Sequence, residues 1–193
     1  MANKIKYGLK NVYYAVATLA SNGSATYATP VAIPGAVSLS MEPQGERSVF
    51  RADDVEYFTS IQNNGYDGDL EIAILPESFE KSILGNFEDG KKVLVEELDP
   101  TVTHFALLFE FKGDASKIKH VLYNCTAMRP TIEGETKGES IDPKTETLSL
   151  HAGSIYVPAL DKDIVKGKTI DTTDSTVDSA WYTTVHVPVA STP

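Results

Sequence analysis

Residues 103–112 have the sequence THFALLFEFK, and this stretch decides the fold class. Its large apolar side chains recur at every second position from Phe105 to Phe111, which is the period of a β-strand. The intervening positions hold Ala106, Leu108 and Glu110. Because Leu108 is apolar as well, we expect this strand to be covered on both faces.

The same alternation continues outward in both directions. Apolar residues take every second position of residues 12–16 and 37–41, and residues 117–128 continue the pattern with Ile118, Val121, Tyr123 and Cys125. Gly, Asn, Asp and Pro separate these runs at short spacing, which is typical of a β-sandwich or barrel. Residues 42–56 are expected to form a β-excursion with a polar tip. Asn63-Asn64-Gly65 predicts a tight hairpin turn that pairs residues 55–61 with residues 69–74.

One short helix is expected at residues 76–85. Pro76 sets φ for a first helical turn, Glu77 suits the helix dipole, and Gly85 can cap the end. Phe79 and Ile83, four residues apart, are its expected buried stripe. The length of 193 residues favours one domain. We divide it into an N-terminal arm (1–11), a β-sandwich core (12–160) and a C-terminal arm or extension (161–193).

The charge balance restricts the partners. There are 17 Lys and Arg against 27 Asp and Glu, a formal net charge of −10. This argues against a protein that grips nucleic acid, because each phosphate contact needs a Lys or Arg. The single cysteine, Cys125, permits no internal disulfide, and the opening residues lack the apolar core of a signal peptide, so we expect synthesis in a reducing cytoplasm. No run is apolar for long enough to predict membrane insertion.

No motif predicts catalysis, a metal or a cofactor. The histidines, His104, His120, His151 and His186, show no metal-ligand spacing. Carboxylate pairs such as Asp53-Asp54 fall at expected loops or strand ends, where a solvated role is favoured over acid–base chemistry. We therefore expect a non-enzymatic protein with no catalytic, metal or cofactor residues.

Four segments resemble a known family. They are KYGLKNVYYA at 6–15, PGAVSLSMEP at 34–43, NNGYDGDLE at 63–71 and PESF at 76–79. In this order they are similar to the major tail proteins, or tail-tube proteins, of long non-contractile-tailed phages and prophages of Gram-positive bacteria. The resemblance covers nearly the whole chain and is least clear after Leu160.

The resemblance implies a structural virion protein with a fold of two packed antiparallel sheets and one helix. Members form stacked hexameric rings around a tape-measure protein and meet tail terminator and baseplate or distal tail proteins. It implies a location in the virion tail, after synthesis in the cytoplasm of the bacterial host. DNA would pass through the lumen without specific binding.

Three segments are candidates for subunit contacts: the arm at residues 1–11, the excursion at 42–56 and the tail after Leu160. Each is polar or turn-rich yet holds apolar anchors that one small domain does not readily bury, namely Leu9, Val49, Phe50 and Trp181. Arg47 and Arg51, near Asp53 and Asp54, are candidates for ion pairs between subunits. The same charged residues also fit a solvated hairpin tip.

The alternative function is a phage decoration or receptor- or carbohydrate-binding β-sandwich module. Such a module is expected to expose aromatic side chains on one face and to remain a monomer or a trimer.

The Trp-containing tail is expected to dock, either on its own domain or on a neighbouring subunit, because an exposed Trp beside Val-rich pairs is an unusual surface.

Overall fold

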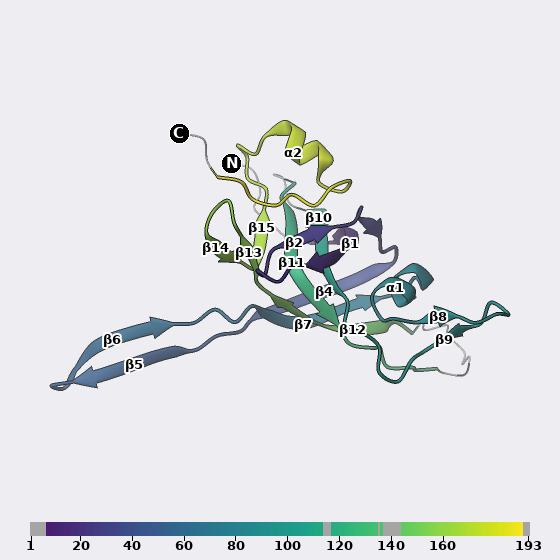
Figure 1. Cartoon of the computed structure of the whole chain (residues 1–193), viewed down its shortest axis with the longest axis horizontal. Helices are drawn as coiled ribbons and strands as arrows, with labels where there is room; N and C mark the ends of the chain where they lie inside the picture. Colours follow the sequence, from purple (N-terminus) through teal and green to yellow (C-terminus); the bar gives the residue numbers. More distant parts are fainter. Residues whose placement is uncertain (1–6, 114–116, 135, 137–143, 191–193) are drawn as a thin grey trace.

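The computed structural model describes residues 7–113, 117–134, 136 and 144–190, and these residues form a mainly antiparallel β fold (Figure 1). The fold class predicted from the alternation is confirmed. In chain order the elements are β1 (Leu9–Leu19), β2 (Ala25–Tyr27), β3 (Val31–Ala32), β4 (Ala36–Pro43), β5 (Arg47–Ala52), β6 (Val55–Ile61), β7 (Tyr66–Ile72), α1 (Glu77–Ser82), β8 (Phe87–Glu88), β9 (Leu94–Val95), β10 (His104–Phe111), β11 (Lys119–Ala127), β12 (Glu146–Gly153), β13 (Ile155–Val157), β14 (Lys162–Ile164), β15 (Lys166–Lys168) and α2 (Ser175–Ala180).

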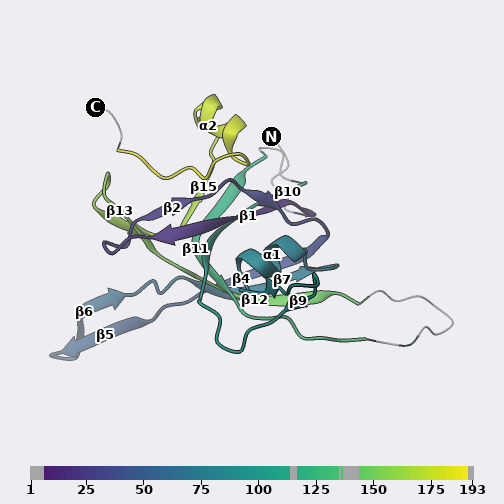
Figure 2. The ribbon, with the colours of Figure 1, turned by 45° about the vertical axis from the view of Figure 1, so that its right-hand side comes forward.

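The largest sheet folds over to make two layers. Its strand order is β2-β1-β10-β11-β12-β7-β4. The turn between the layers is at β11, whose first half pairs with β15 and whose last residues pair with β12. One layer holds β1, β2 and β10, and the other holds β4, β7 and β12, as Figure 2 shows. The fold is therefore sandwich-like although the strands are connected in one sheet.

Strand β10 is buried on both faces, as its sequence predicts. Phe105 and Leu107 belong to a core between the two layers, here called the inner core. Ala106 and Leu108 belong to a second cluster on the other face, here called the outer core. Continuous apolar patterning of this kind is expected only where both faces of a strand are covered.

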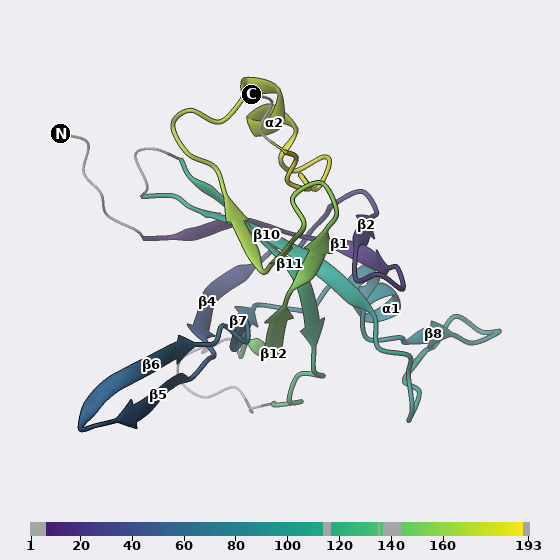
Figure 3. The same ribbon diagram turned by 60° about the vertical axis from the view of Figure 1, so that its left-hand side comes forward.

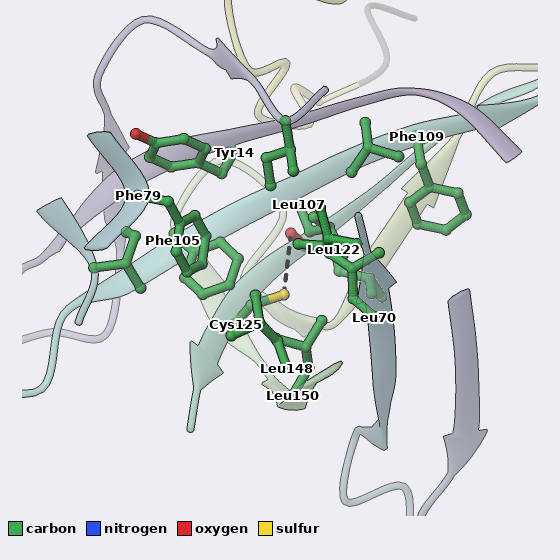
Figure 4. Close-up of a cluster of buried hydrophobic side chains, with 14 of the residues drawn as sticks. Tyr14, Leu70, Phe79, Phe105, Leu107, Phe109, Leu122, Cys125, Leu148 and Leu150 are labelled. Atoms are coloured by element: carbon green, nitrogen blue, oxygen red, sulfur yellow. Dashed lines mark hydrogen bonds between the residues drawn. The ribbon is translucent and has the colours of Figure 1, made fainter. Parts of the chain in front are cut away.

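The inner core contains α1 as well as both layers (Figure 4). Phe79 of α1 is fully buried and makes edge-to-face contacts with Tyr14 and Phe105, at centroid distances of 5.0 and 5.5 Å. The helix is confirmed at its predicted place but is shorter than residues 76–85. Pro76 is the N-cap, and Gly85 adopts a φ of +78° beyond the helix end.

The described residues after Leu160 pack on the chain's own domain. β15 joins the main sheet through β11, and Trp181, after α2, is buried in the outer core. The second helix was not predicted, because its six residues have no apolar stripe buried along them. At the other end, β1 begins at Leu9, so the last residues of the predicted arm are strand. Residues 1–6 lie outside the described residues.

β4 and β5 form one side, and β6 and β7 the other, of a continuous two-stranded ribbon. Between the strands, Gln62 N–H donates to Glu46 O and Gln44 N–H donates to Gly65 O, both at 2.9 Å. The predicted pairing of β6 with β7 is therefore wrong, since β6 pairs with β5. The turn lies at Asp53-Asp54, whose φ values of 50° and 61° are those of a type I′ turn.

Candidate assembly surfaces

The outer half of the ribbon, strands β5 and β6 with their turn, projects from the body (Figure 3). Here it is called the projecting hairpin. Phe50 and Phe58 are cross-strand neighbours, and each is 61 % exposed. Val55, Tyr57 and Ile61 are also exposed. An isolated two-stranded hairpin is marginally stable in water, and apolar side chains gathered on one indicate a surface that is buried by a partner.

The charged residues of the projecting hairpin pair with each other. Arg47 and Arg51 both reach the Glu56 carboxylate, at 3.3 and 3.4 Å. Asp53 and Asp54 form the turn itself. All these side chains are exposed, and exposed pairs contribute only about 0–1 kcal/mol each. The arginines therefore lose little if they exchange Glu56 for another carboxylate.

The predicted apolar anchors fall in three different environments. Phe50 is exposed on the projecting hairpin, and Val49 beside it is partly buried. Leu9 packs at the margin of the inner core. Trp181 is only 3 % exposed and belongs to the outer core, so its side chain is not available to a neighbouring subunit. The structure therefore brings Val49 and Phe50 together on the projecting hairpin, whereas Leu9 and Trp181 lie in the body of the fold.

A groove lies at the opposite end of the β7–β12 ladder. Pro43 of β4 pairs with Tyr66 where the ribbon leaves the body, whereas Glu146 pairs with Ile72 at the far end. The groove beyond Ile72, here called the end groove, has a volume of about 260 Å³. Ile74 and Ile132 line it although they are 74 % and 98 % exposed. This surface was not predictable from the sequence, because its residues come from segments that are far apart in the chain.

The end groove is acidic. Its lining contains Glu80, Glu96, Glu133 and Glu146 against two cations, Arg129 and Lys144. Arg129 is engaged by Glu96 at 2.7 Å. Burial raises the pKa of Glu80 above its usual value, and the nearby carboxylates of Glu146, Glu77 and Glu96 raise it further. The negative charge of this groove is therefore only partly compensated.

A third surface is the solvent face of β4, β7 and β12, here called the polar face. Three carboxylates of β7 are hydrogen-bonded across it. Asp67 binds His151 Nδ1 at 2.5 Å, and Asp69 accepts from the Ser149 hydroxyl at 2.8 Å. Glu71 accepts from Thr145 and Ser38, and these bonds lower its pKa. A hollow of about 680 Å³ lies over this face and contains Glu42 in its lining.

Nothing in the described part of the chain assembles a reaction centre. Within those residues, no group of three or more His, Cys, Asp or Glu side chains is placed to hold a metal ion. Cys125 is fully buried, and burial raises the pKa of its thiol to about 12. Among the described residues, no helix has the length and apolar character to cross a membrane.

Comparison with known proteins relates the chain to others through its fold. No protein-family model matches the sequence, and no curated protein matches it. Among solved structures, a cryo-EM structure of the anti-feeding prophage cap (AFP tube terminating cap) matches with a TM-score of 0.50 and 10 % identity, over 88 % of this chain and 94 % of that one. A chain in the six-fold symmetrised anti-feeding prophage baseplate matches with a TM-score of 0.45 and 9 % identity, over 89 % and 99 %. At 10 % identity the first match shows a shared fold.

Proposed function

We propose that this chain is a structural tail-tube subunit, a non-enzymatic protein that assembles into stacked rings, with six subunits in each. The projecting hairpin is the main support for the proposal, because β5 and β6 extend away from the body (Figure 1) and expose Phe50 and Phe58. The fold shared with the tube terminating cap of a prophage particle supports the same class of role. The family resemblance of the sequence supplies the ring size.

The placement of the apolar surfaces supports the proposed ring. The projecting hairpin and the end groove lie at opposite ends of strand β7. A contact between two different surfaces of one chain is heterologous, and it generates a closed ring when the rotation between neighbours closes. Such a ring also covers the free edges of the hairpin, which would otherwise be open to uncontrolled strand pairing.

The polar face suits the wall of a conduit for DNA. Carboxylates and hydroxyls make up most of its polar groups, and the described lining of its hollow contains neither Lys nor Arg. Duplex DNA carries about one phosphate charge per 1.7 Å, so a basic wall would hold it through many salt-dependent contacts. An acidic wall lets DNA pass. The proposed partners are further copies of the chain, a tape-measure protein, and the terminator and baseplate or distal proteins of a virion tail.

Electron microscopy of the purified chain tests this function. Negative-stain images over a concentration series, with light scattering for mass, are expected to show hollow six-fold rings or tubes. A chain that remains monomeric at every concentration, including after addition of a tail-initiating complex, would contradict the proposal.

The N-terminal arm is tested by a short deletion. Because β1 begins at Leu9, only residues 1–6 are removed, which leaves the strand intact. The deleted chain is expected to fold with an unchanged denaturation midpoint and to form fewer tubes. Equal tube formation would remove the arm from the assembly.

A receptor- or carbohydrate-binding module is the second candidate, and the exposed aromatic side chains Phe50, Tyr57 and Phe58 favour it. Aromatic rings that are grouped on a surface can stack on sugars or pack on proteins. A compact trimer without a lumen in the same images would support this candidate over the tube.

A further inference from the structure

The end groove has the composition of a docking site for an apolar segment that carries positive charge. Ile74 and Ile132 present apolar surface to this groove, and among the described residues both side chains remain largely exposed. Four glutamates line the same groove against two cations. A purely apolar partner would leave the excess negative charge of the groove uncompensated, so a partner that also carries a basic group fits it better.

Two further observations indicate that the end groove lacks positive charge and a hydrogen-bond donor. The pKa of Glu80 is raised by burial and by its carboxylate neighbours, so additional positive charge would stabilise the ionised groove. Asn86 lines the groove, and its Oδ1 atom is buried without a hydrogen-bond partner. A buried acceptor left unsatisfied costs free energy until a donor reaches it.

The projecting hairpin carries both the apolar side chains and the positive charge that the end groove requires. Phe50 and Phe58 form an exposed cross-strand pair on one face of the hairpin, and the alternation of β5 places Arg47 and Arg51 on its other face. Among the described residues, Glu56 holds the two guanidinium groups through long contacts of 3.3 and 3.4 Å. Arginine suits such a site because its planar guanidinium group carries five N–H donors and can bind one carboxylate through two parallel hydrogen bonds.

We infer that the end groove of one subunit receives the projecting hairpin of a second copy, with Phe50 and Phe58 against Ile74 and Ile132 and the two arginines facing the groove glutamates. The hairpin and the groove lie at opposite ends of β7. Each subunit therefore inserts its hairpin at one end and receives the hairpin of a neighbour at the other. This inference rests on the proposed function, because it names the surfaces through which the ring closes.

Complementary variants test the contact. Phe58→Asp places a charge on the projecting hairpin and disables it, and Ile132→Asp does the same to the end groove. Each variant alone is expected to lose ring and tube formation, with association weakened at least about 30-fold, as for a central interface residue. An equimolar mixture retains one intact contact, so it is expected to give heterodimers and no rings in sedimentation velocity. Lys162→Glu, on exposed β14, is the control and is expected to assemble like the unmodified chain.

Cross-linking gives a second readout that does not need tubes. Phe58→Cys and Ile132→Cys chains, mixed and oxidised, are expected to give a disulfide-linked dimer, whereas Phe58→Cys with Lys162→Cys gives none. Cys125 is fully buried and does not interfere.

The outcomes separate the two proposals. Normal assembly of both aspartate variants, or no heterodimer and no selective cross-link, overturns the inference while tubes of the unmodified chain still support the function. Selective cross-linking in a chain that never forms tubes supports the contact between hairpin and groove and overturns the proposed tail-tube function.

Discussion

The Tyr182 hydroxyl donates a hydrogen bond of 3.0 Å to the carboxylate of Glu110. Glu110 is 5 % exposed and lies on β10, at the margin of the outer core. Asn11 Nδ2 and Lys10 Nζ, both from β1, approach the same carboxylate at 2.8 Å. One buried carboxylate thus joins the C-terminal segment to two strands of the main sheet, which explains how a polar tail is held in place.

Removing the Tyr182 hydroxyl tests this attachment. Tyr182→Phe is expected to lower the free energy of unfolding by about 1.5–3 kcal/mol, the usual contribution of a hydrogen bond to a charged group. Urea denaturation measures it. Tyr57→Phe, on a ring that is 75 % exposed, is the matched control and is expected to change nothing. Equal stability of both variants would show that the segment is held by its apolar side chains alone.

Phe79 is expected to be the residue of α1 on which the inner core depends. Phe79→Ala removes a fully buried ring and its contacts with Tyr14 and Phe105, so a loss of about 3–5 kcal/mol is expected. Thermal and urea unfolding give the value. Phe87→Ala, at a half-exposed ring on β8, is expected to stay within about 0.5 kcal/mol. A loss below about 1 kcal/mol for Phe79→Ala would contradict this packing.

Gly68 on β7 is required by close backbone contact. A Cβ atom there would lie 1.8 Å from the Ser40 carbonyl oxygen of β4. Gly68→Ala is therefore expected to push the strands apart and to destabilise the chain by about 1–3 kcal/mol, as overpacking does. Gly90→Ala is the control, because nothing lies within 4 Å of its added Cβ. Two-dimensional NMR amide shifts of β4 and β7 would reveal the local displacement, and unchanged shifts would refute it.

Alkaline pH is expected to destabilise the fold through buried groups that must stay protonated. Burial raises the pKa of Cys125 from 9.0 to about 12 and that of Tyr123 from 10.0 to about 12. Since the folded pKa lies above the unfolded value, the stabilisation is complete below about pH 9 and is lost as pH rises toward 12. Urea midpoints at pH 7, 9 and 10.5 measure this. Cys125→Ala is expected to flatten the decline between pH 9 and 10, and an identical slope would exclude the thiol as its cause.

The local elements were predictable because their signals lie in adjacent residues. Alternation identified β10 and its burial on both faces from Phe105, Leu108 and their neighbours, and Pro76 located α1. These features depend on side-chain period and backbone sterics, which short stretches of sequence contain.

Strand partners were less predictable. Gly65 was assigned to a hairpin turn, but it lies within the ribbon, and Asp53-Asp54 makes the turn. The end groove was missed because Ile74 and Ile132 are far apart in the chain, and Ile74 was assigned to a strand that ends at Ile72 in the structure.

By itself, the sequence determined that this chain is a β protein with one strand buried on both faces and an acidic surface. Only the tertiary structure decided what covers that strand: Trp181 and Val185 of the same chain, rather than a neighbour. It also decided that Phe50 and Phe58 remain uncovered. The physical reason is that alternation reports how much apolar surface must be buried, whereas the partner that buries it depends on contacts between distant segments.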